Sequence, residues 1–209
     1  MPQKPPKKPR LWQIREKQNN LEQLIKVVKL FIGRLPDRQS ILGVYALIVT
    51  LVYSWTLFTS FYKLPSWMFY LTISQILSVY AYSFSMDLAE SILALTGVLF
   101  LEFTLFLTLR NREEFQARSI LVILVVLISS MLRLALFQTY EDIEAFLSGE
   151  LIWWAITLPL GTLLAVFAPK SKRIRNILEG IAERAIIFLY IYLPLSFISL
   201  IVVIVRNIY

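Results

Sequence analysis

Six apolar runs dominate the chain after residue 40, and each is about long enough to cross a bilayer. They fill about residues 41–62, 67–85, 88–109, 119–138, 151–168 and 185–205. A helix needs roughly 20 predominantly apolar residues to span the hydrocarbon core. None of the runs alternates apolar and polar residues, as the strands of a membrane β-barrel do. The sequence therefore predicts an all-α fold, a polytopic membrane helical bundle with six apolar segments that make five or six spans.

The rest of the composition limits the chemistry that the chain can perform. The connections between the apolar runs are short, so they leave no room for a separate soluble catalytic domain. The sequence has no cysteine and no histidine, which excludes thiolate zinc, histidine-ligated metals and the commonest general base. We therefore expect no cofactor, no metal and no enzymatic activity. An enzyme that relies on the acidic connections alone is the weaker alternative.

The excess positive charge lies entirely before the first apolar run. Residues 1–40 contain ten Lys or Arg and three Asp or Glu, whereas residues 41–209 contain eleven of each class. Residues 1–12 are rich in Pro and Lys and contain one aromatic residue, Trp12, but no nucleic-acid-binding motif. This pattern predicts a basic tail, either a solvated tail or one that binds anionic lipid headgroups, and no nucleic-acid partner.

An amphipathic helix is predicted at residues 20–35, between the basic tail and the first apolar run. Its apolar residues recur every three or four positions, and Glu22, Lys26 and Lys29 lie opposite them. A helix of this type lies in the membrane interface or docks on a partner, and we favour the interface. The predicted organisation is thus a tail and interfacial helix in residues 1–40 and a transmembrane domain in residues 41–209.

The charges of the connections favour five spans over six. Basic residues mark the cytoplasmic side of a membrane protein. Here the basic stretches are residues 1–40, 110–118 and 170–184, and a single Lys63 follows the first run. With six spans the N-terminal segment and the basic connections lie on opposite sides. With five spans they share the cytoplasmic side of the cell membrane. The second run, which contains Gln75 and several Ser and Tyr residues, is the least apolar and is our candidate for a segment that does not span.

Glu102 and Arg133 are charged residues that the sequence places deep inside apolar runs. Such residues usually face a cavity or a partner. Glu102 is either a proton-relay or ligand-binding carboxylate or, as we favour, a group that hydrogen-bonds to Ser, Thr or Tyr of a neighbouring helix. Arg133 lies about 10 Å from the level of Glu102 in an antiparallel hairpin. It is therefore expected to extend the other way, toward acidic residues such as Glu90, Asp87 or Glu141.

Acidic residues gather in two connections that hold no Lys or Arg. Asp87 and Glu90 follow the second run, and a second cluster follows the fourth, with Glu141, Asp142, Glu144 and Glu150. Two carboxylate clusters on one face are able to bind Mg²⁺. Their spacing lacks the repeated Asp motifs of membrane prenyltransferases, so we interpret them as solvated acidic faces.

The remaining signals concern helix shape and packing. Pro159 and Pro194 lie in the middle of the last two runs, where each is able to kink its helix. Such interruptions mark sites in some transporters, although packing is the better interpretation here. Small residues at spacing four predict close helix contacts, and Trp residues at run ends predict interface anchors. The small residues are Thr157, Gly161 and Ala165 in the fifth run and Ala46, Thr50 and Ser54 in the first. The Trp residues are Trp67, Trp153 and Trp154.

Two functions fit these features. The first is a non-enzymatic scaffold, assembly factor or accessory subunit, with membrane protein partners or further copies of the chain, and it predicts that Glu102→Gln leaves the role intact. The second is a small transporter or substrate-binding membrane component that uses Glu102 and Arg133. Small substrate-capture subunits of vitamin importers resemble the chain in size and hydropathy, although no motif supports that resemblance.

Overall fold

The computed structural model describes residues 37–105, 114–136 and 143–208. The predicted basic tail and the predicted interfacial helix at residues 20–35 lie outside these ranges. Within them the chain is helical and contains no strand. Residues Arg38–Tyr209 form one compact unit.

Five α-helices make up the described chain, together with one short 3₁₀ turn, η2. Each α-helix is long and apolar enough to cross a membrane, so the prediction of a multi-pass helical membrane protein is confirmed, with five candidate spans. The helices are α2 (Arg38–Tyr70), α3 (Ile73–Leu105), α4 (Phe115–Leu136), α5 (Ile143–Phe167) and α6 (Lys172–Ile208), and η2 is Ala168–Lys170.

The second apolar run does not form a segment of its own. Its first residues, from Trp67, complete α2, which continues through Pro65 to Tyr70. Its remainder begins α3, which runs without a break from Ile73 to Leu105. The expectation of a connection at residues 86–87 is therefore wrong. The chain turns instead at residues 71 and 72, where Thr72 caps the N-terminus of α3.

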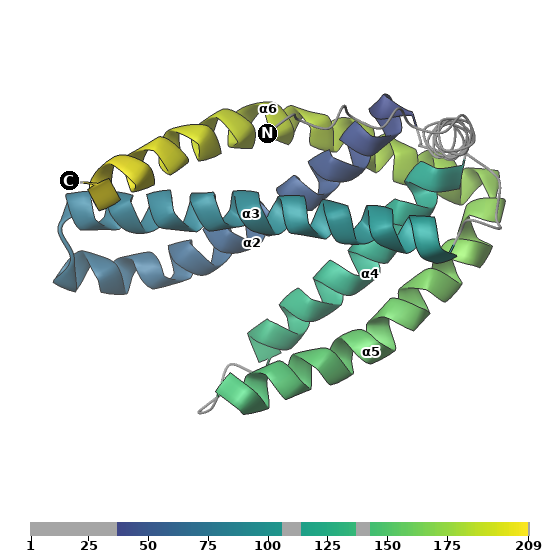
Figure 1. Ribbon diagram of the computed structural model, residues 1–209, viewed down its shortest axis with the longest axis horizontal. Coiled ribbons are helices and arrows are strands. Elements are labelled where there is room, and N and C mark those ends of the chain that lie inside the picture. The colour runs from purple at the N-terminus through teal and green to yellow at the C-terminus, as the bar shows by residue number, and fades with distance from the viewer. Residues whose placement is uncertain (1–36, 106–113, 137–142, 209) are drawn as a thin grey trace, which may run out of the picture. The chain divides into compact units, whose positions relative to one another are not determined.

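Helices α2, α3 and α6 pack along one another, and α4 packs against α2 and α6. In Figure 1 the turn between α2 and α3 lies beside the C-terminal end of α6, while the start of α2 and the end of α3 lie toward the other end. We call that other end the basic end, because the start of α6 places Lys172, Arg173 and Arg175 there. The opposite end is called the far end.

The core between these helices is mainly aliphatic and is centred on α2. The largest fully buried side chains in it are Tyr53, Ile48 and Ile120. Helix α5 packs chiefly on α4, where Gly161 allows close approach, since a Cβ placed at that glycine would lie 3.6 Å from Cα of Val122. Thr157 and Ala165 flank Gly161 on the same buried face, so the predicted stripe of small residues is a helix contact. The other predicted stripe is not, because Ala46 is buried and Ser54 is exposed.

Candidate functional site

Glu102 lies one turn from the end of α3, at the basic end of the unit. Its Oε1 accepts a hydrogen bond of 3.2 Å from the Ser119 hydroxyl of α4. The residue before Ser119, Arg118, is buried and forms an ion pair of 2.6 Å with Glu114, which immediately precedes α4. Glu102 therefore holds α3 against α4 through a serine, which is the structural alternative that the sequence favoured.

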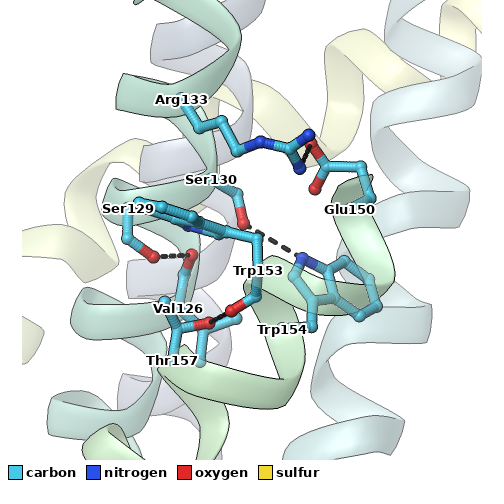
Figure 2. A network of polar contacts seen from close by, with 8 residues as sticks. All are labelled: Val126, Ser129, Ser130, Arg133, Glu150, Trp153, Trp154 and Thr157. Carbon is cyan, nitrogen blue, oxygen red and sulfur yellow. Dashed lines mark hydrogen bonds and ion pairs between the residues drawn. The ribbon is translucent and has the colours of Figure 1, made fainter. Parts of the chain in front are cut away.

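Arg133 bonds to Glu150, a residue that the sequence placed in an acidic connection. Nη1 of Arg133 on α4 lies 2.6 Å from Oε1 of Glu150 on α5, and the side chains are only 8% and 16% exposed (Figure 2). The guanidinium also lies over the ring of Trp153, 6.0 Å from its centroid. Arg133 was expected not to pair with Glu102, and this contact is consistent with that expectation. The prediction of its partner was wrong, because Arg133 pairs with Glu150 and not with Glu90, Asp87 or Glu141.

Further polar contacts follow the same α4–α5 contact toward the basic end (Figure 2). The indole Nε1 of Trp154 donates to Oγ of Ser130 on α4 at 3.1 Å. The Thr157 hydroxyl donates to the carbonyl of Trp153 at 3.0 Å. These contacts stay within or between two neighbouring helices, so they fasten the hairpin. The indole Nε1 of Trp153 is buried there without a hydrogen-bond partner among the described residues.

Gln75 caps a helix and does not lie deep in one. Oε1 of Gln75 accepts from the backbone N–H of Thr72 at 2.8 Å, and the backbone N–H of Gln75 donates to the Thr72 hydroxyl at 3.4 Å. This reciprocal pair is a capping box. The two prolines do lie inside helices, Pro159 in α5 and Pro194 in α6.

Asp87 and Glu90, predicted to lie in an acidic connection, lie in the middle of α3. The reason is that the weakly apolar residues 73–85 and the strongly apolar residues after Glu90 form one continuous helix. Of the other predicted cluster, Glu141 and Asp142 lie outside the described residues, and Glu144 lies in the first turn of α5. Among the residues that the structure describes, no three acidic side chains come together as a metal site.

The depth of Asp87 and Glu90 follows from contacts at the two ends of α3. Toward the far end, the Tyr82 hydroxyl donates to Asn207, in the last turn of α6. Toward the basic end, Glu102 bonds to Ser119 at the start of α4. At about 1.5 Å per residue, Glu90 lies about 12 Å from the level of Tyr82 and about 18 Å from that of Glu102. On this scale Glu90 lies near the middle of the apolar layer, and Asp87 lies about 8 Å inside the level of Tyr82.

Asp87 faces the core of the unit and is 4% exposed. Its Oδ1 accepts a hydrogen bond of 2.8 Å from the Thr56 hydroxyl of α2. Its Oδ2 is also buried and has no hydrogen-bond partner among the described residues. A buried carboxylate usually has several donors or a cation, so a carboxyl oxygen without a partner is unusual in a native core.

Hydroxyl groups from three helices surround this level of the core, and we call them, with Asp87, the polar seam. The Tyr53 hydroxyl bonds to that of Ser196 on α6 and donates to the Phe84 carbonyl at 3.4 Å. On the basic-end side of Asp87, the hydroxyls of Tyr45 and Ser91 are joined at 3.4 Å. The polar seam consists of Tyr45, Tyr53, Thr56, Asp87, Ser91 and Ser196. The sequence analysis missed it, although its α2 members recur every three to eight residues on one face.

Glu90 lies one turn after Asp87 but faces outward and is exposed. No hydrogen bond or ion pair joins its carboxyl group to the residues that the structure describes. Its neighbours on that face of α3 include Leu93, 73% exposed, and Gly97, where a Cβ would meet nothing within 4 Å. The polar seam and Glu90 together form the candidate site, a pair of carboxyl groups in the membrane interior with one facing the core and one facing outward.

No family model, curated protein or solved structure matches this chain.

Proposed function

We propose that this chain is a non-enzymatic subunit of a larger membrane assembly. The observation that supports the proposal is Glu90, a carboxyl group on the outer surface of α3 with no partner in the described chain. A charged side chain at the centre of a membrane helix costs roughly 3 kcal/mol on insertion scales. A partner that neutralises the carboxyl group removes this cost and so binds selectively at this level.

The chemistry of Glu90 indicates the partner, a membrane helix that carries Lys or Arg at the same depth. The face around Glu90 suits such a helix, because Ala89 and Gly97 allow close approach of two backbones. A second copy of this chain fits less well. Away from the basic end, its described helices carry three basic residues, Lys63, Arg133 and Arg206. Arg133 already bonds to Glu150, and Lys63 and Arg206 lie near the far end, not at the level of Glu90.

Site-specific photocrosslinking in native membranes tests this proposal. A photoreactive residue at Leu93, one turn from Glu90, is expected to crosslink to one membrane protein whose helix contains a basic residue. Glu90→Gln should reduce that crosslink at least tenfold. The basic residue of the partner is then changed to Glu, and Glu90→Lys should restore the crosslink to this altered partner.

The matched controls are a photoreactive residue at Phe197 on the exposed face of α6 and the variant Glu102→Gln. We expect the first to crosslink to lipid, and the second to leave the Leu93 crosslink unchanged because Glu102 bonds to Ser119 inside the chain. Crosslinking of Leu93 to lipid alone, with a native mass equal to one chain, would refute the proposal.

We also propose that the basic end faces the cytoplasm of a cell, with residues 1–36 on that side and Tyr209 on the other. The support is that basic residues cluster in 1–40, 110–118 and 170–184, which five crossings bring to one side. Anionic lipids on that side are the expected partners of the basic N-terminal segment.

A small transporter is the second candidate function, and Asp87 is the observation that favours it. Glu102 and Arg133 no longer support transport, since each is bonded within the chain. Purified protein in vesicles that contain a pH-sensitive dye tests this candidate under an imposed pH gradient. Proton flux that falls to the level of empty vesicles in Asp87→Asn would support transport, and wild-type flux equal to that of empty vesicles would refute it.

A further inference from the structure

Asp87 has fewer hydrogen-bond donors and nearby positive charges than a buried ionised carboxylate requires. It receives one hydrogen bond, from Thr56, and its Oδ2 is buried without a partner. Transfer of an unpaired ionised carboxylate into an apolar medium is very unfavourable, so in practice the group is neutralised or paired. The lipid around the unit offers no hydrogen bonds, so a further partner for Oδ2 has to come from within the unit.

No basic side chain of the neighbouring helices is placed to neutralise Asp87. Helix α2 has no Lys or Arg between Arg38 and Lys63, and α6 has none between Arg184 and Arg206. The titratable groups that face this level are tyrosines and one acid. Tyr53 comes from α2 and Tyr192, which stacks on it, from α6, whereas Tyr80 and Glu90 belong to α3.

A bound proton would neutralise the Asp87 carboxylate without any further ligand atoms. Divalent cations such as Mg²⁺ and Ca²⁺ need about six or more oxygen ligands, whereas a proton needs one carboxyl oxygen. The other seam hydroxyls are already engaged, Tyr53 with Ser196 and Ser91 with the Leu88 carbonyl. We propose that Asp87 is an intramembrane proton-binding site, in which the carboxyl group takes up and releases a proton while Thr56 holds its other oxygen.

The geometry also indicates the side from which the proton is exchanged. Tyr80 lies two turns before Asp87 on the same face of α3, and its hydroxyl is likewise buried without a partner. It lies nearer the far end, about 10 Å from Asp87 along the helix axis. No comparable unpartnered hydroxyl occurs on the basic-end side of Asp87 among the described residues, so we place the exchange route at the far end.

Infrared difference spectroscopy of the full chain in lipid vesicles tests the site directly. A protonated carboxyl group in an apolar site gives a carbonyl band that shifts in heavy water, and no variant is needed to detect it. The variant Glu90→Gln removes the other carboxyl group of this turn. In that background we expect one band that disappears reversibly at alkaline pH and is lost completely in Asp87→Asn, an isosteric change that keeps an acceptor for Thr56.

Two further variants distinguish a proton site from a merely structural carboxyl group. Thr56→Val removes the hydrogen bond to Oδ1 and should shift the frequency of the band, whereas Thr56→Ser should not. Glu102→Gln is the matched control, because its carboxyl group lies at the basic end, and it should leave the band unchanged.

Three results would overturn the inference. The first is absence of the band at every pH, which means that Asp87 stays ionised. The second is a band that persists at every pH, which means that the proton is never released. The third is loss of the band on replacing a large organic cation with Na⁺ at constant pH, which would assign the site to a metal ion. This inference deepens the transport candidate, but it also holds if the chain is a subunit, since binding is measured without flux or partner.

Discussion

The residue pair Arg133 and Glu150 illustrates how a membrane interior uses charge. Each side chain is largely buried, and the two nitrogen and oxygen atoms lie 2.6 Å apart with the Trp153 ring beneath the guanidinium. A buried pair of this kind adds little net stability compared with apolar residues, but removal of one partner leaves an uncompensated buried charge. Arg133 thus makes the α4–α5 contact specific for one alignment of the two helices.

Arg133→Ala is expected to lower the free energy of unfolding by about 3 kcal/mol, because Glu150 then remains buried without its partner. Detergent-titration unfolding followed by circular dichroism measures the change. A matched control is Arg175→Ala.

The ion pair of Arg175 with Glu179 is 3.8 Å long and partly exposed, so its loss should change the free energy of unfolding by less than about 0.5 kcal/mol. The double variant Arg133→Ala, Glu150→Ala should lose less than the sum of the two single changes. Equal effects of the Arg133 and Arg175 changes would contradict this assignment.

Gly149→Ala should weaken the same contact by another route. A Cβ at Gly149 would clash with Nη2 of Arg133, so the guanidinium must move away from its present position beside Glu150. We expect a loss of about 1–2 kcal/mol, as for other overpacked contacts, in the same unfolding assay. Gly97→Ala is the matched control, since a Cβ there meets nothing within 4 Å. It should leave stability unchanged or raise it slightly through helix propensity. If Gly149→Ala left the free energy of unfolding unchanged, Arg133 would be shown to move without loss of stability, which would contradict this prediction.

At the scale of elements, α3 is the helix whose boundaries most change the interpretation of the sequence. Its start is set by Thr72 and Gln75, whose capping box supplies partners for backbone groups at the helix N-terminus. Beyond this cap nothing in residues 73–105 forces a break, since the segment contains no proline and its one glycine, Gly97, continues the helix. Asp87 and Glu90 therefore stay inside α3 despite their charge.

Thr72→Ala is expected to destabilise the first turn of α3 by about 1 kcal/mol, the usual effect of losing an N-cap. Amide hydrogen exchange measures this locally, and the amides of residues 73–75 should exchange about fivefold faster. Ser78→Ala is the control, because the Ser78 hydroxyl only donates to the Ser74 carbonyl of its own helix. Unchanged exchange in Thr72→Ala would mean that packing against α2, and not the cap, fixes this helix start.

At the scale of the whole molecule, the five helices remove a conflict between the charge signals. The sequence expectation of six runs placed the basic N-terminal segment opposite the basic connections. Joining most of the second run to the third within α3 leaves five candidate crossings. With five crossings, the proposed orientation assigns the basic stretches 1–40, 110–118 and 170–184 to one side, whereas the single residues Lys63 and Arg206 lie toward the other. The same joining moves Asp87 and Glu90 from the membrane surface to its interior.

Single-cysteine accessibility mapping checks this arrangement, and the chain suits it because it has no cysteine of its own. Thr72→Cys in the turn between α2 and α3 and Lys170→Cys in η2 are both exposed positions. In sealed cells a membrane-impermeant maleimide should label Thr72→Cys and not Lys170→Cys, with labelling of both after permeabilisation. Labelling of both in sealed cells, or of Lys170→Cys alone, would contradict the proposed orientation.

The sequence by itself determined the class of the protein, because apolar runs of membrane length leave a helical bundle as the available solution for backbone hydrogen bonds. It also determined the small-residue contact at Gly161 and the location of the prolines inside helices, since these depend on local spacing. The structural role of Glu102 was anticipated for the same reason, as a carboxyl group near a helix end needs only one neighbouring hydroxyl.

The tertiary structure decided what each charged residue contacts. The partner of Arg133 depended on the alignment of α4 with α5, and the surroundings of Asp87 depended on three helices that are distant in sequence. Hydropathy averages over a window, so it treated Asp87 and Glu90 as the end of a weak apolar run. Packing against α2 and α6 stabilises that stretch as helix and buries Asp87, and for this reason the most informative carboxyl group of the chain became evident only in three dimensions.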